Sequence, residues 1–423
     1  LLLIFTLLMG TGAAFIAPAW QAIVPQLVPR PELQQAIALN SVGINISRAI
    51  GPAVGGLVIA VVGLWAPFML NAISFIFVIG VLIWWKAGSG EARALPAERF
   101  TGAIRAGLRY TRESGPVRNT LYRAIGFFLF ATCYWALLPL IARDLLKGGP
   151  SYYGLLLASI GGGAVLAALG LPKLKKILGP NKVVATGSAG TALVLVIFAM
   201  SSNQIAGLGA SMLAGASWLA VLSSLNVSTQ LALPEWVRAR GLSMLLTVYF
   251  GAMAGGSVIW GNIAGQIGVP TTLLIAAGGA ALAIPITWRW KIIADPSIDL
   301  TPSFHWPVPV MASEIEEDRG PVMVTVEYQI DPKNREAFQS AMENYGHTRR
   351  RDGAFSWGIF EDVSAPGRFL EYFLVDSWLE HERQHHRVTE ADIEIEKQVM
   401  QYHLGETRPI ARHLIAPTPP KSQ

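Results

Sequence analysis

One charged residue, Arg48, lies near the middle of an apolar stretch at residues 38–62. Asn45 precedes it by one helical turn and Asn40 by about two, so the three side chains share a broad face of a helix. A charge at mid-membrane costs about 2.5–3.5 kcal/mol, so it usually faces a cavity or a partner. The spacing predicts a path for a polar solute, with Asn226 as a further polar position. The alternative is a structural arginine satisfied by backbone carbonyls.

Small and helix-bending residues follow in the same stretch, namely Gly51, Pro52, Gly55 and Gly56. Glycines let helices approach closely, and proline interrupts the backbone hydrogen bonds so that a helix can bend. The pattern therefore indicates a close helix crossing beside the predicted path. It requires no direct contact with a solute.

A third pattern, near the C-terminus, has the spacing of a zinc-hydrolase helix: His381, Glu382 and His385. Histidines four residues apart share a helix face and can bind one zinc ion while the glutamate acts as a base. The surrounding run, residues 378–392, is charged nearly all round, and no second motif supplies a third ligand. We therefore reject zinc hydrolysis and predict a solvated helix, with no metal and no cofactor.

The composition is uneven along the chain. Apolar residues make up 52% of the 423 residues and charged residues 14%, against roughly 25% charged in ordinary soluble domains. Residues 1–296 hold 20 Lys and Arg against 7 Asp and Glu, whereas residues 297–423 hold 13 against 21. This predicts a membrane-embedded part followed by an acidic soluble part. The net charge of +5 averages the two and gives no support for nucleic-acid binding, and the single cysteine, Cys133, excludes a disulfide framework.

A helix that crosses a bilayer needs about 20 mostly apolar residues. By that measure the sequence predicts nine spans, near residues 1–24, 38–62, 66–85, 120–142, 151–171, 182–201, 204–229, 241–265 and 270–290. Lysine and arginine are concentrated in alternate loops, among them the stretch from Lys86 to Arg123. That asymmetry places the basic loops and the C-terminus in the cytoplasm and residue 1 outside.

The apolar part also contains an internal repeat. A shift of 205 residues aligns Gly10 with Gly215 and Gly51 with Gly256 without gaps. Residue 1 then corresponds to residue 206, and the three spans before residue 206 have no counterpart in the first half. Transporters are often built from repeated halves, so we predict a twelve-span protein of six plus six helices, of which this chain lacks the first three. A genuine nine-span protein is the alternative.

These features resemble the major facilitator superfamily. Residues 51–56 are similar to the fifth-helix signature of its proton-driven exporters, and residues 16–76 resemble the enterobactin-exporter-like, transmembrane secretion effector branch. The resemblance covers residues 1 to about 290. A second stretch resembles the superfamily's basic cytoplasmic loop motif, without its acidic residue, at Gly170, Lys173, Lys175, Lys176, Gly179 and Lys182.

The resemblance implies secondary-active export by alternating access, in a bacterial cytoplasmic membrane. Its expected partners are protons, exchanged by antiport, and a small-molecule substrate such as a siderophore, a macrolide or another drug-like compound. Arg48 would hold a proton-linked partner or an anionic group of the substrate. Because no Asp or Glu lies deep in the nine predicted spans, either the coupling carboxylate lies in helices upstream of this chain or coupling works another way.

The predicted organisation follows from these spans. Residues 1–85 form the last three helices of the first half, and residues 120–290 form the second half. Residues 86–119 link them through a basic amphipathic helix, from Arg99 to Arg112, whose Ile104 and Leu108 would lie on the cytoplasmic leaflet of the lipid bilayer. The remainder divides into a linker at 291–320, a cytoplasmic domain at 321–416 and a short tail at 417–423.

The cytoplasmic domain shows period-2 alternation, which is typical of strands. Strands are predicted at residues 321–330, 354–362, 368–376 and 408–415, and helices at residues 332–350 and 377–402. The order βαββαβ is that of a ferredoxin-like α+β domain.

This domain resembles the antibiotic-biosynthesis-monooxygenase-like domains, which are small dimeric α+β barrels, and the resemblance implies a homodimer formed through it. No catalytic residue can be assigned, so the chain is predicted to be a transporter and not an enzyme. One alternative is a cofactor-free monooxygenase-like activity in this domain, and another is a ligand sensor, with the membrane part as an anchor.

Overall fold

The computed structural model describes residues 65–85, 100–293, 318–405 and 407–417, together with short pieces at 4–5, 8–12, 43, 47, 58, 62–63, 295, 297–306 and 315–316. The chain divides into two compact units. We call Leu1–Ala92, Asn119–Ser228 and Leu245–Ile292 the bundle unit, and Arg93–Arg118, Thr229–Met244 and Ile293–Gln423 the tail unit.

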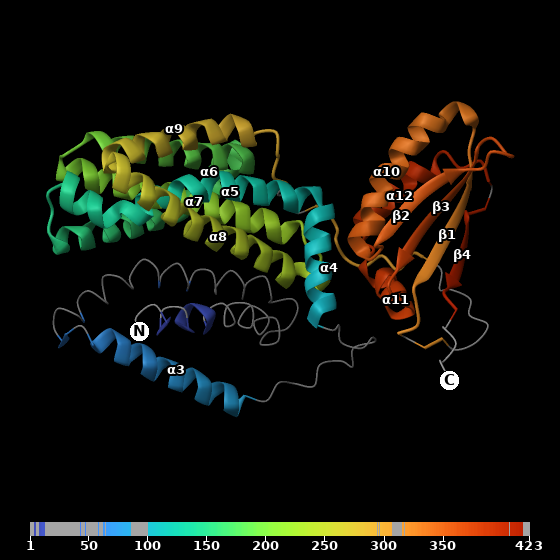
Figure 1. Cartoon of the computed structure of the whole chain (residues 1–423), viewed down its shortest axis with the longest axis horizontal. Helices are drawn as coiled ribbons and strands as arrows, with labels where there is room; N and C mark the ends of the chain where they lie inside the picture. The colour runs from blue at the N-terminus through green and yellow to red at the C-terminus, as the bar shows by residue number, and fades with distance from the viewer. Residues whose placement is uncertain are drawn as a thin grey trace. The chain divides into compact units, whose positions relative to one another are not determined.

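Six helices in the described part of the chain are long and apolar enough to cross a membrane. They are α3 (Ala66–Trp84), α5 (Gly115–Leu140, extended by the π-helical turn Ile141–Leu145), α6 (Pro150–Met200), α7 (Gln204–Leu231), α8 (Glu235–Ile267) and α9 (Val269–Thr287) (Figure 1). They coincide with seven of the nine predicted spans, because α6 contains two. The first two predicted spans, 1–24 and 38–62, lie mostly outside the described residues.

The sequence predicted a loop at residues 170–182. The structure corrects this prediction, because the segment is helical except at one residue. Gly179 has φ 73° and ψ 163°, and it breaks α6 into two helices. A positive φ of this size is easy only for glycine, so the residue type fixes the position of the break. Leu171 before the break and Val183 after it both pack with Ala220 of α7, which holds the two halves of α6 on a common partner.

Helices α6 and α7 cross in close contact through two glycines. A Cβ atom on Gly163 would lie 1.9 Å from the carbonyl oxygen of Met212, and one on Gly215 would lie 1.8 Å from that of Ile160. Both obstacles are backbone atoms, which cannot turn away as a side chain can. The crossing therefore requires glycine on both helices.

The tail unit begins with α4 (Phe100–Glu113), which confirms the helix predicted at 99–112. One face is buried, because Tyr110 packs with Val117, Leu233 and Val237. The hydroxyl group of Tyr110 also donates a hydrogen bond to the carbonyl oxygen of Ala232, at 3.2 Å. The opposite face exposes the apolar side chains of Ile104 and Leu108.

The rest of the tail unit is built on a four-stranded antiparallel sheet in the order β2-β3-β1-β4. The strands are β1 (Val322–Gln329), β2 (Ser356–Glu361), β3 (Arg368–Val375) and β4 (Ile410–Ile415), each inside its predicted range. The helices are α10 (Arg335–Asp352, after a 3-10 turn at Pro332–Asn334), α11 (Trp378–Arg387) and α12 (Glu390–Met400).

The core of this domain lies between the sheet and the helices α10 and α12 (Figure 1). Alternate residues of β1 point into it, as the period-2 pattern predicted, from Val322 to Tyr328. Phe338 and Met342 of α10 and Val399 of α12 close the core from the helical side.

We expect Gly163→Ala to destabilise the bundle unit, because the new methyl group would collide with the backbone of α7. Overpacking of this kind costs about 1–3 kcal/mol. Gly162→Ala is the matched control, since a Cβ there meets nothing within 4 Å. Thermal unfolding of the purified protein in detergent measures the difference. Equal unfolding temperatures for the two variants would contradict the close crossing.

Candidate functional site

Most of the predicted transport path lies outside the described residues. This holds for Arg48, Asn45 and Asn40, and for the helix-packing residues Gly51, Pro52, Gly55 and Gly56. Their roles therefore stay predictions. Asn226 is described, and it lies on α7 with an exposed side chain.

The basic loop motif makes one specific contact in the bundle unit. The Nζ atom of Lys175 donates a hydrogen bond to the hydroxyl oxygen of Ser223 on α7, at 2.9 Å. This contact joins the end of the first half of α6 to α7. The other motif residues are exposed, except the half-buried Gly179 at the break: Gly170, Lys173, Lys176 and Lys182.

Arg123 is the charged residue that sequence analysis placed wrongly. It was assigned to a basic loop, but α5 already begins at Gly115 and its Arg123 is only 2% exposed. The Nη1 atom of Arg123 donates to the side-chain oxygen of Asn181, at 2.9 Å, and its Nε donates to the carbonyl oxygen of Thr287, at 3.3 Å. Its guanidinium group also lies over the ring of Trp288, 5.5 Å from the centroid.

Asn181, two residues after the break in α6, links Arg123 to the end of α9. Its side-chain nitrogen donates to the carbonyl oxygen of Ile292, and its side-chain oxygen accepts from the backbone amide of Ile292, both at 3.0 Å. One buried cation thus holds together the start of α5, the break in α6 and the residues after α9. One sequence signal for this contact was present, because the polar Asn181 lies inside the basic motif. The interpretation of the motif rested on its lysines alone.

The helix with zinc-hydrolase spacing, α11, is not a solvated helix as predicted. It buries Trp378, Leu379, His381, Gln384 and Arg387. The Nε2 atoms of His381 and His385 lie 3.3 Å apart, and Glu382 accepts a hydrogen bond from the indole nitrogen of Trp378 at 2.9 Å. Burial lowers the pKa of His381 to about 3 and that of His385 to about 4, and the neighbouring imidazoles add to both shifts. Both rings are therefore neutral at pH 7.

Within the residues that the structure describes, no three His, Cys, Asp or Glu side chains are arranged to hold a metal ion. The rejection of a metal at His381, Glu382 and His385 remains a prediction.

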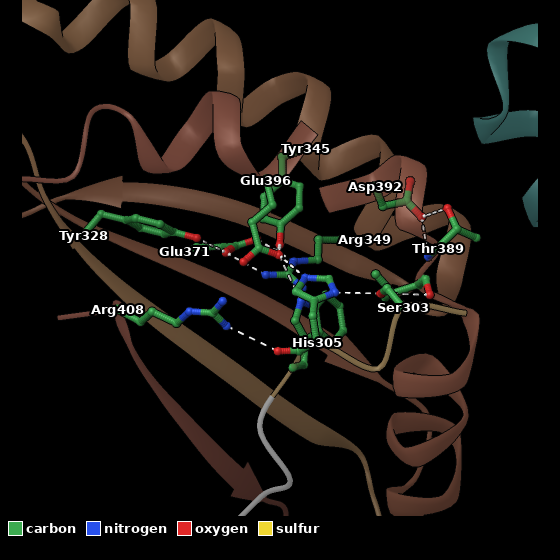
Figure 2. Close-up of polar contacts among 12 residues, drawn as sticks. Ser303, His305, Tyr328, Tyr345, Arg349, Glu371, Thr389, Asp392, Glu396 and Arg408 are labelled. Carbon is green, nitrogen blue, oxygen red and sulfur yellow. Dashed lines mark hydrogen bonds and ion pairs between the residues drawn. The ribbon is translucent and has the colours of Figure 1, made fainter. Parts of the chain in front are cut away.

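The most developed polar site lies in the core of the tail unit, around the fully buried Glu371 of β3. Its carboxylate accepts hydrogen bonds from the Nε of Arg349 at 3.0 Å, the hydroxyl of Tyr328 at 3.0 Å and the indole nitrogen of Trp357 at 2.9 Å. These donors come from α10, β1 and β2. Figure 2 shows Tyr328 and Arg349 converging on Glu371. The carboxylate therefore joins one helix to three strands.

Arg349 is surrounded by aromatic rings as well as by its carboxylate. Its guanidinium carbon lies 4.4 Å from the ring centroid of Tyr345 and 4.6 Å from those of Phe373 and Trp306. Burial works to lower the pKa of Arg349, but the adjacent Glu371 outweighs it and raises the pKa above the ordinary value. The side chain therefore stays charged, and rings can stack on it.

A second carboxylate, Glu396 of α12, collects three donors on one oxygen atom. Its Oε2 lies 2.8 Å from the Nε2 of His305, 3.0 Å from the Nε1 of Trp306 and 3.1 Å from the hydroxyl of Tyr345. Burial would raise the pKa of Glu396, but the hydrogen bonds from His305 and Trp306 lower it below the ordinary value. Figure 2 shows Tyr345 and His305 meeting at this carboxylate. We call Glu371, Arg349, Tyr345 and Glu396 the polar core.

Two donors to Glu396, His305 and Trp306, come from the segment that was predicted to be only a linker. Residues 299–306 instead pack on the turn between α11 and α12. The amide of Ser303 donates to the carbonyl oxygen of Val388, that of Glu390 to Thr301, and that of Ala391 to Asp299, all at 3.0 Å. We call residues 299–306 the strap. The sequence did not predict its packing, because its proline and acidic residues are typical of linkers and its partners lie about 90 residues away in sequence.

Sequence analysis missed the polar core, although one signal was present. In β3 the buried positions are Phe369, Glu371, Phe373 and Val375. A glutamate in the apolar register of an alternating strand needs a buried partner. The partner on α10 could not be named from sequence alone.

Comparison with known proteins gives a family. The sequence profile of the transmembrane secretion effector family matches residues 1–420. The chain is 28% identical over 206 residues to the staphyloferrin A transporter of Staphylococcus aureus, which covers 47% of this chain and 50% of that protein. It is 27% identical over 280 residues to the enterobactin exporter EntS of Escherichia coli, which covers 66% and 65%. The chain therefore spans half of one of these relatives and less than two thirds of the other.

We expect Glu371→Gln to destabilise the tail unit strongly, because Arg349 would keep a buried charge without a counter-charge. Breaking a buried ion pair costs about 3–5 kcal/mol. The matched control is Glu361→Gln on β2, which removes a more exposed pair with Arg335 and should cost about 0–1 kcal/mol. Urea unfolding of the full chain, followed by tryptophan fluorescence, compares them. Equal midpoints would show that the buried pair is not a main support of the tail unit.

Proposed function

This chain belongs to the transmembrane secretion effector family of the major facilitator superfamily, and we propose that it is a secondary-active exporter of a small molecule across the bacterial cytoplasmic membrane. The family match over residues 1–420 carries the proposal, and the six described apolar helices support it. Transport would follow alternating access, in which two helical halves rock around a site near the middle of the membrane.

The proposed substrate is a siderophore, with a macrolide or another drug-like compound as the alternative. The relatives named for staphyloferrin A and enterobactin support this choice. So does a group of rings in the bundle unit, where Trp218 of α7 lies 5.5 Å from Trp135 of α5 and 6.0 Å from Tyr249 of α8. Such a surface suits a substrate with flat aromatic groups.

The proposed driving force is proton antiport, and the proposed coupling residue is Arg48. In this scheme Arg48 holds a proton-linked partner or an anionic group of the substrate, next to Asn45 and Asn40. Gly51 and Pro52 belong to the helix packing that limits leakage. The basic loops, with the exposed Lys173 and Lys176, support a cytoplasmic position for the tail unit.

For the tail unit we infer the ferredoxin-like type that pairs into a dimeric α+β barrel. The face of the sheet away from its helices exposes large apolar side chains, with Phe360 62%, Leu370 41% and Ile410 61% exposed, beside the charged Glu327 and Arg412. Phe360 also stacks on Tyr372 across β2 and β3, at 5.6 Å and 22°. A second copy of this chain is the proposed cover for that face.

A second candidate function is a ligand-binding or cofactor-free oxygenase activity of the tail unit, which the buried polar core favours. Such an enzyme would turn over a quinol in the isolated full-length protein. We expect no turnover, because the family match is to transporters.

We expect Arg48→Ala to lower export at least about tenfold, which corresponds to about 1.4 kcal/mol, because the only predicted cation on the path would be lost. Arg143→Ala is the control, since that side chain is 72% exposed and pairs with the adjacent Asp144. Efflux of a radiolabelled siderophore from cells that express each variant at equal level measures the effect. Unchanged proton-coupled efflux in Arg48→Ala would refute the assigned role.

We expect Phe360→Glu to convert a dimer into a monomer, because the interface would lose its large aromatic ring and would have to bury a carboxylate from each copy. Val363→Glu is the control, since Val363 is fully exposed at the turn after β2. Light scattering of the protein in detergent gives the mass. A native chain that is already monomeric at micromolar concentration would overturn the dimer.

A further inference from the structure

We propose that the polar core of the tail unit is a binding site for a flat aromatic molecule with a hydrogen-bond donor, and that Trp306 of the strap occupies this site as an internal ligand. The inference rests on the second candidate function and not on export. A chain that exports a siderophore but fails the binding test overturns this inference alone.

The contacts of Trp306 define what the site recognises. Its indole nitrogen donates to Glu396 at 3.0 Å, and Arg349 lies over its ring at 4.6 Å. The ring of His385 meets it edge-on, with centroids 5.4 Å apart at 89°. An acceptor, a stacked cation and an edge-on ring together select a planar aromatic group with an N–H or O–H. An anionic group in place of the donor would face the carboxylate of Glu396.

The site does not depend on the strap for its own construction. Glu371 and Arg349 pair on β3 and α10, and the hydroxyl of Tyr345 on α10 reaches Glu396 of α12. These contacts involve no residue of the strap. If the strap left, Glu396 would lose two of its three donors, His305 and Trp306, and Arg349 would lose one of its three rings, which a ligand of the same chemistry could restore.

The strap is held in a strained conformation next to Trp306. Phe304 has φ 48°, in the left-handed region that non-glycine residues avoid. Its neighbours fix it there, because Ser303 binds the carbonyl oxygen of Val388 and His305 binds Glu396. Strain of this kind is found at ligand clamps and switch segments. It disfavours the internal ligand relative to an external one that carries no such strain.

Competition between internal and external ligand gives a direct test. An occupied site binds an external molecule with an affinity reduced by the fraction of open sites. The probe is 5-fluoro-N-acetyltryptophanamide, which carries the indole of Trp306, and its binding to the full chain in detergent is followed by fluorine NMR. We expect Trp306→Ala to bind the probe at least about tenfold more tightly than the native chain.

Three further variants make the outcome specific. Trp306→Phe, which keeps a ring but loses the donor, should tighten binding by a smaller factor and stands in if Trp306→Ala fails to fold. Val363→Ala, at a fully exposed position outside the strap, should bind as weakly as the native chain. Glu396→Gln combined with Trp306→Ala should lose most of the gain. Equal affinity in the native, Trp306→Ala and Trp306→Phe chains overturns the proposal, and so does a gain that survives Glu396→Gln.

Discussion

The burial of charge is the constraint on which both units depend. A cation removed from water must find acceptors or a counter-charge, because its desolvation otherwise exceeds what packing can return. The bundle unit meets the requirement at Arg123 with neutral groups, namely the amide of Asn181 and a backbone carbonyl. The tail unit meets it at Arg349 with the carboxylate of Glu371. In each case the acceptors come from several elements, so satisfying one charge also fixes how those elements pack.

The buried ion pair has a consequence for the tail unit beyond stability. Apolar side chains of similar volume would often hold such a core equally well or better, so stability alone does not account for Glu371 and Arg349. A charged core does provide oriented acceptors and a cation on which rings can stack. That chemistry is suited to recognising a molecule, and Trp306 is already bound by it. The polar core is therefore better understood as a recognition surface that also supports the fold.

The sequence predicted what is periodic and local. The apolar helices and all four strands follow from runs of about 20 apolar residues and from alternation with period 2. The sequence did not predict the buried contacts of Arg123, because its acceptors are 58 and 164 residues away. It did not predict the strap for the same reason. The sequence predicted a longer loop around Gly179, because a stretch rich in proline and lysine is typical of loops. Only the backbone geometry shows that a single residue there is non-helical.

The course of the chain ties the tail unit to the spans in more than one place. Besides the C-terminal domain, the tail unit contains Arg93–Arg118, which includes α4 and the start of α5, and Thr229–Met244, which includes the end of α7 and the start of α8. Inside this unit Arg109 of α4 pairs with Glu380 of α11 at 3.0 Å, and Glu380 also pairs with Arg387 at 2.6 Å. One of these segments, through α4, therefore shares a largely buried ion pair with α11 of the C-terminal domain. A movement of α4 must therefore either carry α11 with it or break the pair between Arg109 and Glu380.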